Sequence, residues 1–179
     1  MKTLVLSFLL FNLSLMASPF VEPAKKAGAA TVLVLANGNK QSGFLASADG
    51  IVLTLYHTLK EAQNITIQKG DLFYSATILS GDLESDIAAL QIPGHRFPYL
   101  EVASSKELLP GQWALIAGFP TRRLSVRRAL ISSLDREFLI VDTPFNEGEF
   151  GGPLLNLEGE VIGIICSNKE NLGLSIPLD

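Results

Sequence analysis

Short runs of β-branched and aliphatic residues, separated by turn residues at fairly regular spacing, fill the chain between residues 30 and 177. This pattern is typical of an all-β barrel or sandwich, in which strands are brief and connections are tight. Helical periodicity is nearly absent, and only residues 58–62 suggest a short helical turn. The pair Asn37-Gly38 favours a two-residue hairpin turn, so one connection follows from turn chemistry alone. The sequence therefore predicts an all-β fold.

The predicted strands fall into two groups of about six that meet near residues 93–108, where Pro93 and Pro98 bracket a non-regular stretch. In the first group, strands are expected at 31–36, 41–46, 51–55, 64–68, 72–79 and 87–92. In the second group, they are expected at 100–102, 113–118, 125–132, 138–142, 153–155 and 161–166. The pattern alone leaves barrel and sandwich open.

The composition fits one globular unit. The chain has 179 residues, of which 47% are hydrophobic and 18% charged, so it can bury a sizeable core. Cys166 is the only cysteine, which excludes an internal disulfide. A formal net charge of −4 gives no general case for nucleic-acid binding. Metal-ligand spacings and glycine-rich phosphate loops are missing from the sequence, so we expect neither a metal nor a cofactor.

The first residues have the three-part layout of a secretory signal. Lys2 precedes an apolar run at residues 4–11, and the small pair Ala17-Ser18 follows it. We therefore expect a bacterial-type signal peptide at 1–17, with export to the periplasm or the extracellular space. An uncut membrane anchor stays open, because Leu15 is larger than the residue usually preferred two places before the cut. Membrane contact is expected only in that case.

Three separate stretches place polar residues or glycines next to predicted apolar strands. His57 follows an apolar strand, Asp86 precedes another, and a glycine-rich run at 147–154 ends in Gly151-Gly152-Pro153-Leu154. Taken singly, each has a plain structural reading: a histidine after an apolar strand is more often structural, and an aspartate before a strand is an ordinary turn carboxylate. Glycines in this order before a proline favour a tight loop with special dihedral angles.

Taken together, these stretches resemble the HtrA (Deg) type of trypsin-like serine protease from about residue 42 to residue 177. The resemblance implies one trypsin-like double-barrel domain in residues 18–179, made of two six-stranded antiparallel β-barrels. Lobe one would span about 27–95 and lobe two about 108–179, without a PDZ domain and with the site between the lobes. The motifs that carry the resemblance lie at 43–45, 49–57, 85–90, 111–120, 142–154, 159–164 and 173–177.

The resemblance also implies roles for individual residues. His57 and Asp86 take the catalytic histidine and aspartate positions, while Phe150 takes the nucleophile position. The backbone N–H groups of Gly148 and Phe150 would form the oxyanion hole, since neither requires a particular side chain. The expected pocket-lining residues are Ile164, Ile165, Cys166, Gly173 and Leu174. The two residues before the histidine, Leu55 and Tyr56, depart from the small or amide residues common in the family.

A phenylalanine at the nucleophile position favours an inactive homologue. The benzyl group has no lone pair and no transferable proton, so it cannot attack a carbonyl group. We therefore expect a catalytically inactive protein that binds a peptide, an unfolded polypeptide or a protein partner. Two alternatives stay open: an active serine-type endopeptidase in extracytoplasmic protein quality control, and an assembly protein whose cleft is unused.

Four arginines make the one concentrated basic stretch of an acidic chain: Arg122, Arg123, Arg127 and Arg128. A solvated face is the ordinary interpretation of such a run. The functional interpretation is a docking surface for an acidic partner or for anionic head groups, with binding that weakens in salt.

Overall fold

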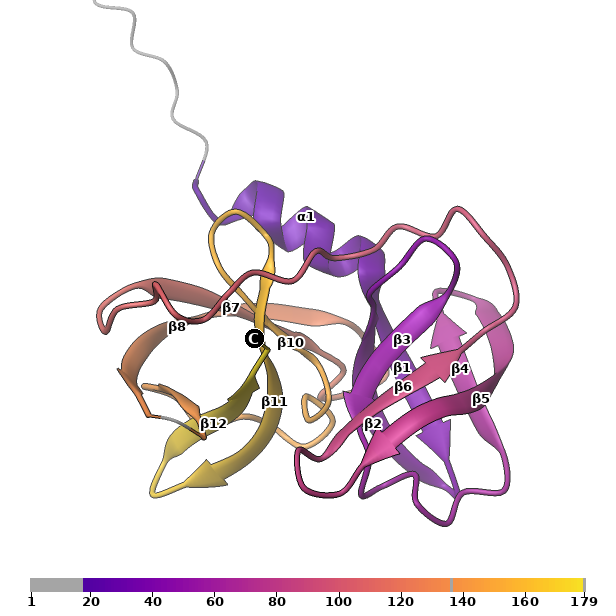
Figure 1. Ribbon diagram of the computed structural model, residues 1–179. Coiled ribbons are helices and arrows are strands. Elements are labelled where there is room, and N and C mark those ends of the chain that lie inside the picture. The colour runs from indigo at the N-terminus through magenta and orange to yellow at the C-terminus, as the bar shows by residue number, and fades with distance from the viewer. Residues whose placement is uncertain (1–17, 136, 179) are drawn as a thin grey trace, which may run out of the picture.

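The computed structural model describes residues 18–135 and 137–178, so the predicted signal peptide lies outside the described residues. The described chain forms two closed barrels of six antiparallel strands each (Figure 1). Their strand orders are β1-β2-β3-β6-β5-β4 and β10-β11-β12-β9-β8-β7. This confirms the predicted all-β fold and decides between barrel and sandwich.

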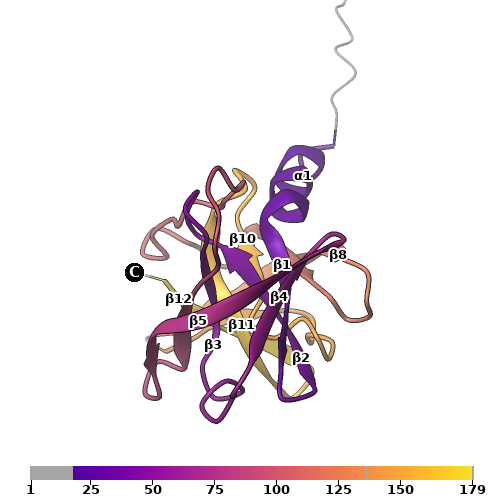
Figure 2. The ribbon, with the colours of Figure 1, turned by 90° about the vertical axis from the view of Figure 1, so that its right-hand side faces the viewer.

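The first barrel follows the predicted strands closely. Its strands are β1 (Thr31–Ala36), β2 (Asn39–Leu45), β3 (Ile51–Leu55), β4 (Ile65–Lys69), β5 (Leu72–Asp82) and β6 (Ile87–Gln91). Asn37 and Gly38 have φ angles of 51° and 81°, as the inner residues of a two-residue hairpin turn require. Figure 2 faces this barrel and shows β5 crossing its outer side, where most residues of that strand are exposed.

The second barrel contains one strand that the sequence pattern missed and lacks one that it predicted. Its strands are β7 (Trp113–Gly118), β8 (Ser125–Leu134), β9 (Leu139–Val141), β10 (Pro153–Leu155), β11 (Val161–Lys169) and β12 (Leu172–Pro177). The prediction of a strand at 100–102 was wrong, because Val102 makes only an isolated bridge to Val161. The sixth strand is β12, which closes the barrel by pairing with both β11 and β9.

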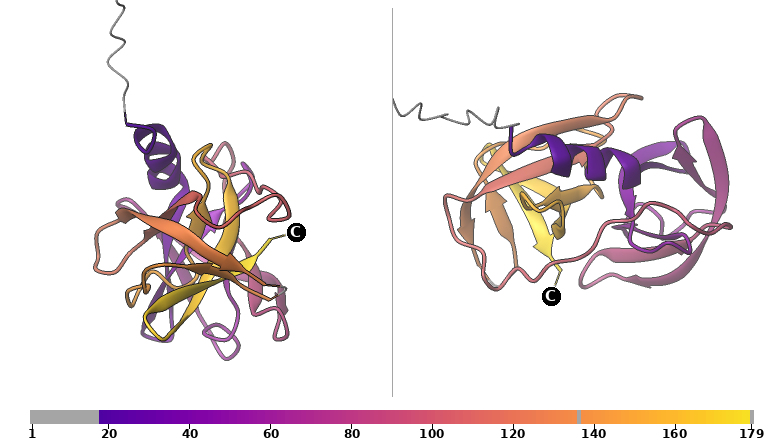
Figure 3. Two further views of the ribbon diagram at one scale, coloured as in Figure 1. Left: turned by 90° about the vertical axis from the view of Figure 1, so that its left-hand side faces the viewer. Right: turned by 90° about the horizontal axis from the view of Figure 1, so that it is seen from above.

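The helix α1 (Val21–Ala30) was not predicted. It lies over the second barrel, where it contacts β7, β8 and β10, and its C-terminal end leads directly into β1 of the first barrel (Figures 1 and 3). Only Pro23, Ala27 and Ala30 are buried, so the helix packs through small residues and shows a weak apolar stripe. The predicted helical turn at 58–62 is instead a series of turns, with Leu59 N–H donating to the Tyr56 carbonyl at 2.8 Å. No described helix is long and apolar enough to cross a membrane.

The buried side chains form two apolar clusters. The larger cluster centres on the first barrel and includes Phe44 and Leu90, and the smaller one centres on the second barrel and includes Ile131 and Val141. Phe150 is partly buried and packs against both clusters. Its ring therefore lies where the apolar interiors of the two barrels meet.

Candidate functional site

Strand pairing in the first barrel brings His57 and Asp86 together. His57 lies two residues after β3, and Asp86 immediately precedes β6. These strands are neighbours, with Leu55 opposite Ile87 in the register. The side chains meet at 2.7 Å between His57 Nδ1 and Asp86 Oδ2.

The loop backbone holds this pair from both sides. His57 N–H donates to Asp86 Oδ1 at 2.8 Å, and Tyr56 N–H donates to the Asp86 carbonyl at 3.0 Å. Asp86 has a φ of 55°, a left-handed conformation that an aspartate tolerates better than most residues. A carboxylate at Asp86 can only accept a hydrogen bond, so Nδ1 of a neutral His57 keeps its hydrogen and Nε2 is left as a proton acceptor. The histidine side chain is 57% exposed, so that nitrogen can be reached from solvent.

A pocket of about 610 Å³ lies beside the pair and between the lobes. His57, Ser85 and Asp86 line it from the first lobe, and Phe138, Cys166 and Ile176 line it from the second. Two further carboxylates, those of Glu84 and Glu137, also border it. The pocket is therefore large enough for a side chain of a bound polypeptide and has an acidic rim.

The glycine-rich loop at 146–152 has a tightly determined backbone. Gly148 and Gly151 have φ angles of 86° and 81°, and a Cβ at either position would collide with a backbone carbonyl, that of Phe119 or that of Ser42. Only glycine fits both the dihedral angles and the space. The loop is also tied to the first barrel, since Ser42 N–H donates to the Phe150 carbonyl at 2.8 Å and Ser42 Oγ donates to the Gly148 carbonyl at 2.6 Å.

Two N–H groups of this loop have no acceptor within the part of the chain that the structure describes. Among the described residues, the N–H groups of Glu149, Gly151 and Gly152 all donate to backbone carbonyls, whereas those of Gly148 and Phe150 donate to none. These two are the groups that the sequence predicted for an oxyanion hole. Unpaired, fixed donors of this kind are available to a carbonyl oxygen of a bound polypeptide.

An ion pair that the sequence analysis did not anticipate lies behind the loop. Glu149 is fully buried, and its carboxylate accepts from Arg127 Nε at 2.9 Å and from Arg127 Nη2 at 2.7 Å. Asn146 N–H adds a third bond, to Glu149 Oε2 at 2.7 Å. Burial raises the pKa of Glu149, but the bonds from Arg127 and Asn146 outweigh it and hold the pKa below the ordinary glutamate value. The carboxylate is therefore ionised at neutral pH.

Of the five residues predicted to line a pocket, Cys166 lines the pocket beside His57. Ile164 and Ile165 are fully buried and belong to the two apolar clusters, while Gly173 and Leu174 are also buried. The buried ring of Phe145 lies against Gly173, so that a Cβ at this glycine would collide with the ring. The Phe145 side chain therefore occupies the space next to β12 at Gly173.

Cys166 is a poor nucleophile in this setting. Its Sγ donates to the Leu174 carbonyl at 3.0 Å. Burial, as the largest cause, raises the pKa of the thiol above its ordinary value, so the thiolate is scarce at neutral pH.

The four arginines of the basic stretch lie in different environments. Arg127 is engaged with Glu149, and it also donates to the Pro144 carbonyl at 2.7 Å. Arg128, the next residue of β8, lies over the rings of Phe20 and Trp113 at 5.3 and 5.4 Å. Arg122 and Arg123 are exposed in the connection between β7 and β8. The docking role predicted for all four stays a prediction.

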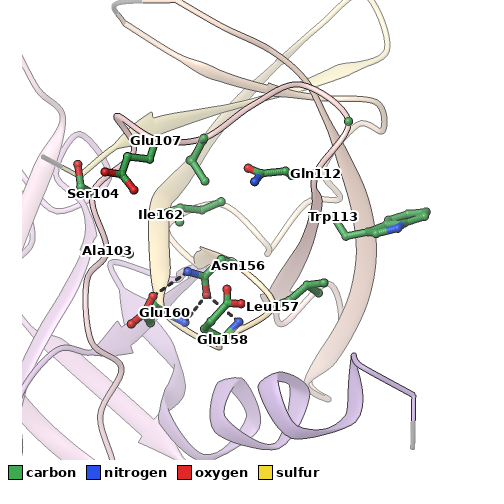
Figure 4. Close-up of a pocket in the computed structure, with 12 residues that line it drawn as sticks. Ala103, Ser104, Glu107, Gln112, Trp113, Asn156, Leu157, Glu158, Glu160 and Ile162 are labelled. Atoms are coloured by element: carbon green, nitrogen blue, oxygen red, sulfur yellow. Dashed lines mark hydrogen bonds between the residues drawn. The ribbon is translucent and has the colours of Figure 1, made fainter. Parts of the chain in front are cut away.

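A second pocket, of about 680 Å³, is lined by residues of the second barrel and of the connection that precedes it (Figure 4), and His57 is not among them. Glu107, Glu158 and Glu160 border it, and Asn156 donates to Glu160 at 2.8 Å. Its apolar wall includes Ile162. Within residues 18–135 and 137–178, no group of histidine, cysteine or acidic side chains is arranged to hold a metal ion.

Two six-stranded barrels with a histidine–aspartate pair between them define a peptidase-type double barrel. The comparison with known families agrees with this class. The chain belongs to the family of trypsin-like peptidase domains, whose model matches residues 41–164.

Several relatives are named as proteases. The chain is 37% identical over 133 residues to a "Probable periplasmic serine endoprotease DegP-like" of Pseudomonas fluorescens, covering 69% of this chain and 28% of that protein. It is 33% identical over 165 residues to "Putative protease Do-like 14" of Arabidopsis thaliana, covering 77% and 38%. It is 33% identical over 155 residues to "Putative serine protease HhoB" of Synechocystis, covering 76% and 37%. The chain thus spans less than two fifths of the length of these relatives.

Proposed function

We propose that this protein is a catalytically inactive HtrA-type homologue that binds a peptide or protein partner. The observation that carries the proposal is Phe150, which follows Gly148-Glu149 and precedes Gly151-Gly152 in the loop where such a peptidase keeps its nucleophile. A phenyl ring offers no atom that can form an acyl bond. Loss of a triad nucleophile costs about a million-fold in turnover.

Neighbouring side chains do not supply a substitute nucleophile. The Glu149 carboxylate is buried against Arg127, and the Thr143 hydroxyl accepts a bond from Arg127 Nη1 at 3.2 Å. The Cys166 thiol is held in its neutral form by burial. The ring of Phe150 is partly buried against both apolar clusters, and it carries no polar atom.

The same site retains what binding needs. The N–H groups of Gly148 and Phe150 are free of protein acceptors within the described chain, and the pocket beside His57 can take a side chain. The carbonyl groups of a polypeptide bound across the loop would accept hydrogen bonds from these two N–H groups, and the polypeptide would not be cut. The preserved glycine geometry keeps these donors in place.

An active serine-type endopeptidase is the second candidate. The assembled His57–Asp86 pair favours it, with its 2.7 Å contact, and the relatives named above are proteases by name. Its role would be extracytoplasmic protein quality control.

A fluorophosphonate probe separates the two candidates. We expect no covalent labelling of the purified native protein and no cleavage of unfolded casein above a buffer control, because the protein has no activated hydroxyl group to react. Mass spectrometry of the incubated protein and gel electrophoresis of the casein are the measurements. An adduct on any side chain, or casein fragments that vanish in the His57→Ala variant, would favour the endopeptidase.

We also propose that the protein is exported. The signal-like layout of residues 1–17 and the word periplasmic in the names of several relatives support this. The mature protein purified from the periplasmic fraction of its host is expected to begin at Ser18. N-terminal sequencing measures this directly, and a mature chain that keeps Lys2 would contradict signal cleavage.

A further inference from the structure

Two adjoining hollows run along the boundary between the lobes, next to the glycine-rich loop. One, of about 290 Å³, is lined by Lys40, Phe119, Arg122 and Gly148, among others. The other, of about 460 Å³, is lined by Phe119, Arg122, Arg123 and Lys69, and reaches the end of α1 at Gly28. The hollows share Phe119 and Arg122, so they adjoin one another, and we treat them together. We name the pair the basic groove.

The basic groove carries a local charge opposite to that of the whole protein. Lys40 and Lys69 come from the first barrel, and Arg122 and Arg123 come from the connection between β7 and β8. Against these four cations stand two carboxylates, Asp71 and Glu147. The chain as a whole has a formal net charge of −4. Cationic side chains from both lobes therefore line the basic groove.

None of these four cations is neutralised within the described chain. In residues 18–135 and 137–178, the lysine and arginine side chains that form ion pairs with carboxylates are Lys25 and Arg127. Lys69 instead donates to the Ala29 carbonyl at 2.8 Å. Burial lowers the pKa of Lys69, because its cationic form is partly desolvated without a counter-charge. An anion bound in the groove would supply this counter-charge and offset the free-energy cost of desolvating the Lys69 cation.

We propose that the basic groove binds an acidic segment of a polypeptide partner. This inference deepens the proposed function and rests on it. A polypeptide is favoured over an anionic membrane because the surface is concave and because Gly148, whose N–H has no protein acceptor in the described chain, lines the groove itself. A chain bonded to that loop would continue directly over Lys40 and Arg122. Its glutamate and aspartate side chains would then meet unpaired cations.

Fluorescence anisotropy with a labelled peptide of alternating glutamate and serine tests the groove. The native protein is expected to bind this peptide more tightly than the same peptide with glutamine in place of glutamate. The double variant Arg122→Glu/Arg123→Glu is expected to bind it about tenfold more weakly or worse, since it places two charges of the wrong sign in the groove. Binding by the native protein should also weaken as salt rises.

The matched control is Lys106→Glu/Lys169→Glu, which changes the net charge equally at exposed positions outside the groove. Its affinity for the acidic peptide should match that of the native protein. Equal loss in control and groove variants would overturn the proposal, because net charge alone would then explain the binding. Unchanged affinity in the groove variant would overturn it as well.

Two further measurements separate failure of the groove from failure of the proposed function. If the native protein binds unfolded casein but not the acidic peptide, the groove proposal fails and polypeptide binding stands. If it binds neither, both fail. Sedimentation with phosphatidylglycerol vesicles covers the membrane: vesicle binding that requires Arg122 and Arg123, without peptide binding, would assign the groove to lipid instead.

Discussion

The Phe150→Ser variant is expected to react covalently with a fluorophosphonate probe at position 150, where the native protein stays unlabelled. The loop keeps its glycine geometry, and Asp86 holds His57 with Nε2 as a proton acceptor. A hydroxyl introduced at this position needs only a neighbouring base to become a nucleophile. General-base assistance contributes about 10²-fold or more, so labelling should be clear over a buffer control. Intact-mass measurement and peptide mapping locate the adduct.

Two control variants make this result interpretable. Phe150→Ala removes the same ring without adding a hydroxyl and should stay unlabelled. Phe150→Ser combined with His57→Ala should lose labelling, because the base is gone. A folded Phe150→Ser protein that fails to label would contradict the assigned position, or would mean that the surroundings of His57 set by Leu55 and Tyr56 have lost the productive geometry.

The same substitution is expected to lower stability. Truncating a fully buried phenylalanine costs about 3–5 kcal/mol, and a partly buried ring such as that of Phe150 costs less. Labelling should therefore be measured well below the melting temperature of the variant, with folding checked by circular dichroism.

The Arg127→Leu variant is expected to lose about 3–5 kcal/mol of unfolding free energy at neutral pH. It leaves the fully buried Glu149 carboxylate without its cation, and an uncompensated buried charge is among the costliest defects in a protein interior. Arg128→Leu, one residue further along β8, is the control. It removes a cation from over Phe20 and Trp113 and should cost only about 0.5–1 kcal/mol. Urea unfolding of the three proteins measures the difference.

The pH dependence of this pair has a definite sign. Because the folded-state pKa of Glu149 is lowered, the carboxylate adds stability above the ordinary glutamate pKa, and that contribution is lost as pH falls through the lowered value. In Arg127→Leu, burial without a cation raises the pKa of the same carboxyl group. The stability gap between native and variant proteins should therefore narrow in acid. A gap that stays constant from neutral to acid pH would mean that Glu149 does not carry the effect.

Sequence reasoning located most strands because their signals are local. The strands at 31–36, 51–55, 113–118 and 153–155 coincide with β1, β3, β7 and β10, since each is a short apolar run bounded by turn residues. The strand expected at 100–102 had the same composition, yet Val102 is 49% exposed and pairs with β11 at a single position. Composition could not distinguish an extended connection from a barrel strand.

Features that depend on contacts between residues far apart in the chain could not be predicted from the sequence. The helix α1 has no side-chain N-cap, contains Pro23 and Gly28, and buries only small residues, so neither a capping signal nor a clear apolar stripe marked it. The ion pair of Arg127 with Glu149 joins residues that are 22 positions apart and that meet only after β8 and the loop are placed. Adjacent arginines in the sequence suggested one patch, but alternation along β8 sends Arg127 inward and Arg128 to the surface. The lysines that lie near Arg122, Lys40 and Lys69, could be identified only once the two lobes were placed together.

The glycine-rich loop is secured through its main chain and through Glu149, while the side chain at position 150 takes no part in any of these bonds. The side chain at position 150 can therefore be changed without removing a hydrogen bond that holds the loop. Cysteine, serine or a photoreactive amino acid could be installed there with the neighbouring donors undisturbed. The scaffold would then serve as a covalent trap that captures its natural partner for identification.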